Sequence, residues 1–109
     1  MMENAQAYLE LASGAMSRGD YLNAIRFARR ASAVPMSEET VRCDAYMLLA
    51  LTSIEMGLAE DALAFAVGAH LAACRVRCPE REQKAASIVA VVISQCPQLG
   101  EQTAATRFH

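Results

Sequence analysis

The feature that most constrains the fold of this 109-residue chain is an internal repeat. Seven residues recur with the same identity and in the same order 38 positions later. A period of this length is typical of stacked helical units, because one unit cannot bury its apolar face alone. The first set is Tyr8, Leu11, Ala12, Gly19, Ala24, Ala28 and Ala31, and the second is Tyr46, Leu49, Ala50, Gly57, Ala62, Ala66 and Ala69.

Glycine and proline divide the chain into five helical segments. Gly19 and Gly57 each follow a run of apolar residues at helical spacing, where glycine readily ends a helix. Pro35 and Pro97 end two other runs, because the residue before a proline is displaced from helical geometry. Pro79 begins the last run, since proline is tolerated in the first helical turn. We expect helices over about 5–17, 21–34, 38–56, 59–77 and 79–95.

Two local details refine this prediction. Ser37, which precedes two glutamates, is the expected N-cap of the third helix. The segment from Ser87 to Ile93 is rich in β-branched residues and could form a strand, but no second strand is expected to pair with it. We therefore predict an all-α fold in which this segment is a largely buried helix.

Composition agrees with such a fold. Hydrophobic residues make up 54% of the chain and alanine about a fifth, whereas aromatic residues reach only 6%. Alanine has the highest helix propensity and allows helix axes to approach closely. Ala12 facing Ala24, and Ala50 facing Ala62, are the expected crossing points within each pair of helices.

The order of large and small residues within each unit resembles the pattern of the tetratricopeptide repeat. Both units have a tyrosine, a Leu-Ala pair, a glycine between the helices and small residues in the second helix, and Pro35 closes the first unit. The period exceeds the usual 34 residues by four, which fit in the linker between the units. The alternative is an alanine-rich bundle without repeats. The resemblance implies one domain over 1–97, with repeats at about 5–35 and 43–78, a capping helix at about 79–96 and a flexible tail at 98–109.

The resemblance also implies a binding groove. In this family the first helix of each pair lines a concave surface, which here is apolar and contains methionine. The lysine and asparagine with which some members hold a partner's carboxylate are absent. The expected ligand is therefore an amphipathic helix or an extended apolar segment of another protein. The residues expected to hold it are Leu9, Ser13, Met16, Met47, Leu51 and Ile54.

By architecture and length, the chain is similar to the small cytoplasmic chaperones of type III secretion that hold the needle subunit before export. Two alternatives remain open. The last helix or a second copy of the chain could fill the groove, or the chain could be a self-associating adaptor or regulatory subunit. The expected surface for self-association is formed by Ile88, Val89, Val92 and Ile93.

Other functional classes have little support in the sequence. His70, Cys74 and Cys78 are spaced along one helical stripe and could contribute to a zinc site with Cys43 or Cys96, but the usual C-x2-C turn is missing. A stripe of packing residues is the preferred interpretation, so we expect neither metal nor cofactor. Motifs for phosphate or dinucleotide binding are absent, as is a histidine base for a cysteine nucleophile, and we predict no enzymatic activity.

Charge and hydropathy restrict the partners further. A net charge of −2 and the low aromatic content argue against nucleic acid. The longest apolar run, Ala85 to Ile93, is about half the length needed to span a bilayer. The chain starts without the basic and apolar pattern of a signal peptide, so we expect reduced cysteines and a cytoplasmic protein.

Overall fold

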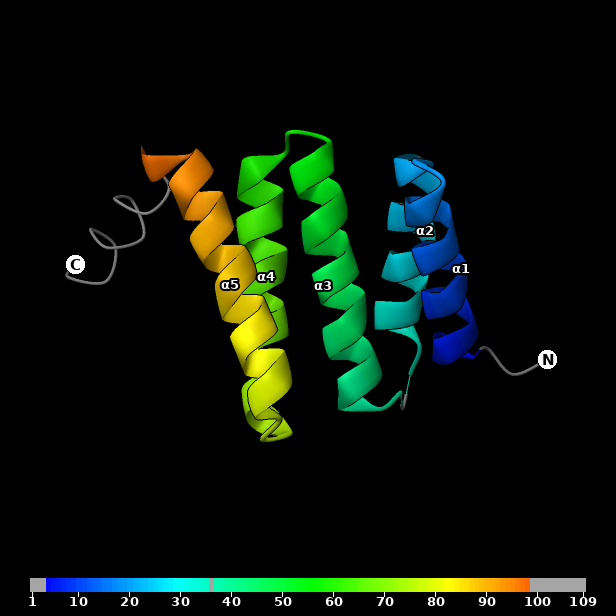
Figure 1. Ribbon diagram of the computed structural model, residues 1–109. Helices are drawn as coiled ribbons and strands as arrows, with labels where there is room; N and C mark the ends of the chain where they lie inside the picture. The colour runs from blue at the N-terminus through cyan, green and yellow to red at the C-terminus, as the bar shows by residue number, and fades with distance from the viewer. Residues whose placement is uncertain (1–3, 36, 99–109) are drawn as a thin grey trace.

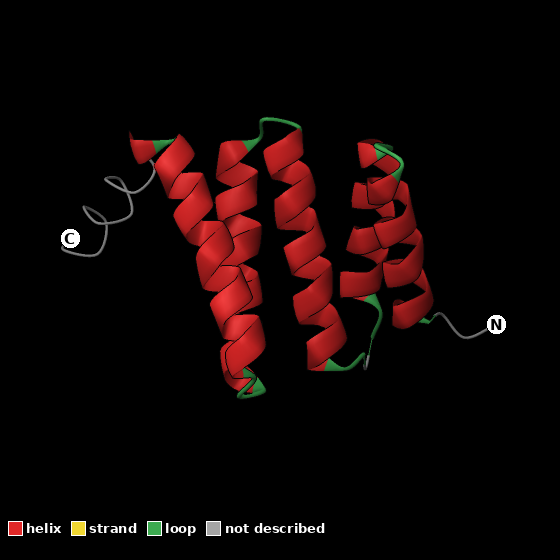
Figure 2. Cartoon of the chain, viewed as in Figure 1, coloured by secondary structure: helices red, strands yellow, loops and turns green. Residues whose placement is uncertain are grey.

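The computed structural model describes residues 4–35 and 37–98, and every regular element in this part of the chain is a helix (Figure 2). The expected all-α class is confirmed, and Ser87 to Ile93 is helical. Each boundary agrees with the sequence prediction to within two residues. The helices are α1 (Ala5–Ser17), α2 (Tyr21–Ala33), α3 (Glu39–Glu55), α4 (Ala59–Arg75) and α5 (Pro79–Gln95).

The helices alternate in direction and form two layers (Figure 1). In this view α1, α3 and α5 lie in front and run the same way, while α2 and α4 lie behind and run the opposite way. Each helix packs against the next along the chain, and α3 also contacts both α1 and α5. This arrangement brings three helices that are separated in sequence onto one face of the molecule.

The turns within the two pairs of helices are built alike. Gly19 and Gly57 have φ angles of 77° and 75°, in the left-handed region that favours glycine. The amide after each glycine donates to a carbonyl in the last helical turn, with N···O distances of 2.9 Å for Asp20 and 2.8 Å for Leu58. The turn after α4 has the same hydrogen bond from Cys78, but Arg77 occupies the left-handed position with a φ of 52°.

The helix starts differ from the prediction in their caps. The N-cap of α3 is Glu38, so the expectation for Ser37 is wrong by one residue. The Ser37 hydroxyl instead accepts a hydrogen bond at 3.4 Å from the guanidinium of Arg42. Only the cap of α1 uses its side chain, because the Asn4 Oδ1 accepts hydrogen bonds from two first-turn amides.

Alanine forms most of the core. Ala12 and Ala24 in the first pair of helices, and Ala50 and Ala62 in the second, are at most 1% exposed. Helices can approach closely where such small side chains meet, and Ala12 of α1 packs with Ala28 of α2 in the core. Larger core residues are few, and Leu49 and Val92 are the largest that are fully buried. Nearly all of the expected flexible tail, residues 98–109, lies outside the described part of the chain.

Candidate functional site

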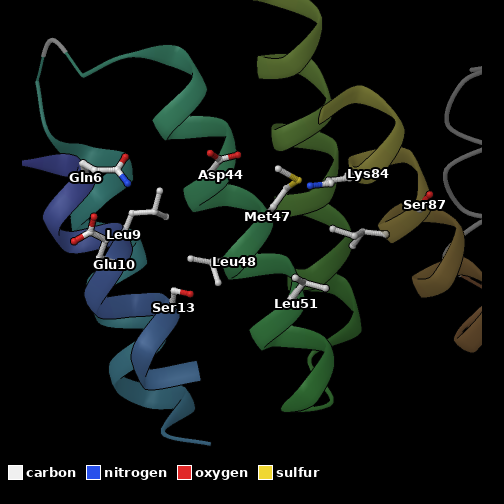
Figure 3. A pocket seen from close by; sticks show the side chains of 11 residues that line it. Gln6, Leu9, Glu10, Ser13, Asp44, Met47, Leu48, Leu51, Lys84 and Ser87 are labelled. Atoms are coloured by element: carbon white, nitrogen blue, oxygen red, sulfur yellow. The ribbon is translucent and has the colours of Figure 1, made fainter. Parts of the chain in front are cut away.

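An open groove of about 610 Å³ lies on the face formed by α1, α3 and α5 (Figure 3). The helix α3 forms its floor, and α1 and α5 form its two walls. Since α2 and α4 lie behind this layer, neither contributes to the lining. The lining residues are Gln6, Leu9, Glu10 and Ser13 from α1, Asp44, Met47, Leu48 and Leu51 from α3, and Lys84, Ser87 and Ile88 from α5.

The floor of the groove is apolar because of the helical spacing of its residues. Positions 44, 47, 48 and 51 fall on one face of α3, and three of the four carry apolar side chains. Leu51 is 38% exposed, so part of its side chain is open to a ligand in the groove. Met47 and Leu48 are half-buried, so their outer atoms remain open to a ligand. The flexible thioether of Met47 can adapt to apolar partners of different shapes.

The α1 wall is divided between core and groove. Leu9 is only 8% exposed, because it also packs against Ala31 and Ala45 in the core. Ser13 and Glu10 are exposed and border the groove. Leu9 therefore supports the wall more than it offers surface to a ligand.

The α5 wall carries charge at one end and apolar surface further along. Arg81 forms a two-pronged ion pair with Asp44 of α3, with distances of 2.9 Å from Nε to Oδ1 and 3.0 Å from Nη2 to Oδ2. This geometry joins α5 to α3 where both helices begin. Lys84 and Ile88 follow along the same wall, one and two turns beyond Arg81.

The structure brings together four of the six groove residues predicted from the sequence. Leu9, Ser13, Met47 and Leu51 line the groove, whereas Met16 and Ile54 are half-buried and lie outside the lining set. The predicted set stopped at α3, because the last helix was treated as a cap. The lining residues that the sequence analysis did not assign to the groove's binding set are Gln6, Glu10, Asp44, Leu48, Lys84, Ser87 and Ile88.

A spacing in the sequence could have identified the third wall. Arg81, Lys84 and Ile88 follow Asp44, Met47 and Leu51 by 37 residues each, one fewer than the internal period. The residue types at these three positions of α5 differ from those of α3, so the repeat is not visible in α5. The described part of the last helix lines the groove as a wall and does not fill it.

The surface expected for self-association is reduced in the structure. Val92 is 1% exposed and belongs to the core, so it cannot meet a second copy of the chain. Ile88 lines the groove, and Val89 and Ile93 are half-buried on α5. These four residues therefore do not form one continuous exposed patch.

The residues of the expected cysteine and histidine stripe do not all lie on one helix, because α4 ends at Arg75 and Cys78 is the N-cap of α5. Within residues 4–35 and 37–98, no three His, Cys, Asp or Glu side chains are placed to share an ion. The Cys74 Sγ lies 3.8 Å from His70 Nδ1, while Cys78 faces Arg81 and accepts a hydrogen bond at 3.5 Å from its Nη1. Cys43 is buried, and its thiol donates to the Ala69 carbonyl at 3.2 Å.

The thiols differ in acidity because their surroundings differ. Burial, with a smaller contribution from the neighbouring Asp44 carboxylate, raises the pKa of Cys43 to about 11. Hydrogen bonds from the backbone and side chain of Arg81 lower the pKa of Cys78. A side-chain hydrogen bond with Glu82 raises the pKa of Cys74. All four cysteines are free thiols.

None of the described helices has the length and apolar character required to traverse a bilayer. Comparison of the chain with protein families, with characterised proteins and with solved structures found no match. The groove is therefore the feature that carries the functional argument.

Proposed function

We propose that this chain is a non-enzymatic protein-binding module of tetratricopeptide type, whose groove holds an amphipathic helix of another protein. The observation that carries the proposal is the open groove of about 610 Å³, which has an apolar floor and is bounded by three helices. Known ligand pockets have volumes in this range, and the apolar floor with the partly exposed Leu51 favours an apolar ligand.

The shape of the groove favours a helix as the ligand. The helices α1 and α5 flank α3 and run in the same direction as it does, so a ligand helix lying along α3 can contact both walls. An amphipathic helix presents a stripe of apolar residues at i, i+3, i+4 and i+7, and this stripe can pack on the apolar floor residues Met47, Leu48 and Leu51. An extended strand would leave its backbone groups without partners against these apolar side chains.

The biological role that fits such a module is a small cytoplasmic chaperone. It would shield the apolar face of an aggregation-prone helical subunit, such as a subunit of a type III secretion apparatus, until that subunit is assembled or exported. The small size of the chain, the repeat in its sequence and the open groove support this role. The four free thiols accord with a reducing compartment.

The test uses two matched leucine substitutions. Leu51→Asp places a carboxylate on the groove floor, and Leu71→Asp places one on α4 in the opposite layer, at a leucine that is 55% exposed. Since both leucines are exposed, both variants should fold as the native protein does. A partner that co-purifies 1:1 from the native cell lysate, identified by mass, should be lost with Leu51→Asp and retained with Leu71→Asp.

Retention of the partner by the folded Leu51→Asp variant would remove the groove from the function. Size-exclusion chromatography of the isolated chain distinguishes partner binding from the alternative of self-association. A stable dimer that resists Leu51→Asp favours an adaptor joined through another surface, whereas a monomer that binds the partner favours the chaperone.

A further inference from the structure

The two walls of the groove carry opposite charges. Glu10 borders the groove on α1 and Lys84 borders it on α5, with Met47 of the floor between them (Figure 3). Both charged side chains are exposed, and neither forms an ion pair or hydrogen bond with another residue of the described ranges. The third charged residue of the lining, Asp44, is already paired with Arg81.

From these two walls we infer that the groove selects the direction in which an amphipathic helix binds, with basic residues along its edge toward α1 and acidic residues along its edge toward α5. This inference rests on the proposed function, since it concerns the ligand of the same groove. Turning a bound helix end for end keeps its apolar face on the floor but exchanges its two edges. One direction then forms ion pairs with Glu10 and Lys84, and the other brings like charges together.

The handedness of the α-helix predicts which direction is favoured. Viewed from solvent with the starts of α1, α3 and α5 at the top, as in Figure 3, α1 lies on the left and α5 on the right. A ligand helix with apolar residues at heptad positions a and d can be placed with its N-terminus at the top. Its e positions then point toward α5 and its g positions toward α1, because the α-helix is right-handed.

A helix with Glu at e and Lys at g should therefore bind parallel to α3, with its N-terminus near the Asp44–Arg81 pair. A helix with Lys at e and Glu at g should bind antiparallel. Exposed ion pairs are individually weak, but the wrong direction both loses two attractions and gains two repulsions. We expect the favoured direction to outnumber the other by about tenfold at low salt.

The experiment uses two synthetic peptides of the same composition. Both have leucine at a and d, and they differ only in the exchange of Glu and Lys between the e and g positions. Each carries a nitroxide attached through a stable thioether at its N-terminus and is added to the full-length, 15N-labelled protein. Paramagnetic broadening should be strongest at the amides of Gln6 and Asp44 for the first peptide, and at those of Ser17 and Ile54 for the second.

Charge-exchanged proteins provide the reciprocal test. The double variant Glu10→Lys/Lys84→Glu should reverse the direction of each peptide. The control Glu60→Lys/Arg26→Glu makes the same exchange at exposed residues of α4 and α2, behind the groove, and should leave both directions unchanged. In 1 M salt, where charges are screened beyond about 3 Å, the tenfold preference should fall toward one while the peptides remain bound.

The outcomes separate this inference from the proposed function. If both peptides bind in the groove without preference, or if the charge-exchanged protein keeps the native direction, direction selection is wrong and the groove function stands. If neither peptide broadens groove amides, or if a second copy of the chain occupies the groove, both are overturned.

Discussion

At the scale of the residue, alanine determines how this chain packs. Ala50 and Ala66, for example, are fully buried, and such methyl side chains allow neighbouring helices to pack closely. Few large residues are available to fill gaps between the helices. Cys43 is one of them, and burial makes its thiol harder to ionise.

Cys43 should make the protein less stable in alkali. Its pKa in the folded state is raised to about 11, whereas an exposed thiol ionises near 8.5. The unfolded chain therefore releases this proton first as the pH rises, so the stabilising contribution is complete below about pH 8 and is lost toward pH 11. The loss should approach about 3 kcal/mol, measured as the free energy of unfolding in urea at a series of pH values.

Two cysteine variants isolate this effect from other groups that titrate in alkali. Cys43→Ala should remove most of the loss in the free energy of unfolding that Cys43 causes between about pH 8 and pH 11, although it lowers stability at neutral pH. Cys96→Ala, which removes a half-buried thiol beyond α5, should retain the native decline. An identical pH dependence in the native protein and Cys43→Ala would contradict the assignment to Cys43.

At the scale of the element, one position in the repeat behaves differently in its two copies. Leu11 and Leu49 are equivalent in sequence, but Leu11 is 50% exposed and Leu49 is 1% exposed. Leu49 packs against Ala12 and Ala28 of the preceding pair of helices. Since no described helix precedes α1, Leu11 has no corresponding neighbour. The difference arises from stacking and not from the helices themselves.

Truncating these two leucines should therefore have unequal effects. Leu49→Ala leaves a cavity in the core and should lower the free energy of unfolding by about 3 kcal/mol. Leu11→Ala should change it by less than about 1 kcal/mol, because the side chain is half exposed. Urea denaturation of both variants measures the difference, and equal losses would show that Leu11 is covered in solution.

At the scale of the whole molecule, α5 completes the groove as well as the stack. Its main contacts are with α4 and α3, whereas α3 packs against all four other helices. The ion pair of Arg81 with Asp44 ties its first turn to α3 beside the groove. This pair has the two-pronged geometry in which partly exposed charges contribute measurably to stability.

Removing this ion pair should loosen α5 selectively. In a double-mutant cycle with Asp44→Asn and Arg81→Met, we expect a coupling free energy of about 1 kcal/mol, limited by the exposure of both side chains. Amide hydrogen exchange should become faster in the first turns of α5 and remain unchanged in α1. No coupling, or equal acceleration in both helices, would mean that the pair does not anchor α5.

The sequence alone determined the helices and their ends, because apolar spacing, Gly19, Gly57 and Pro79 act over a few neighbouring residues. It also predicted four of the groove residues, since their spacing on α1 and α3 is local. The tertiary structure decided that α5 forms the third wall, that Leu9 is largely committed to the core, and that Glu10 and Lys84 border the groove on opposite sides. These properties depend on which helices become neighbours, and burial and opposed charge are set by packing between residues far apart in the chain.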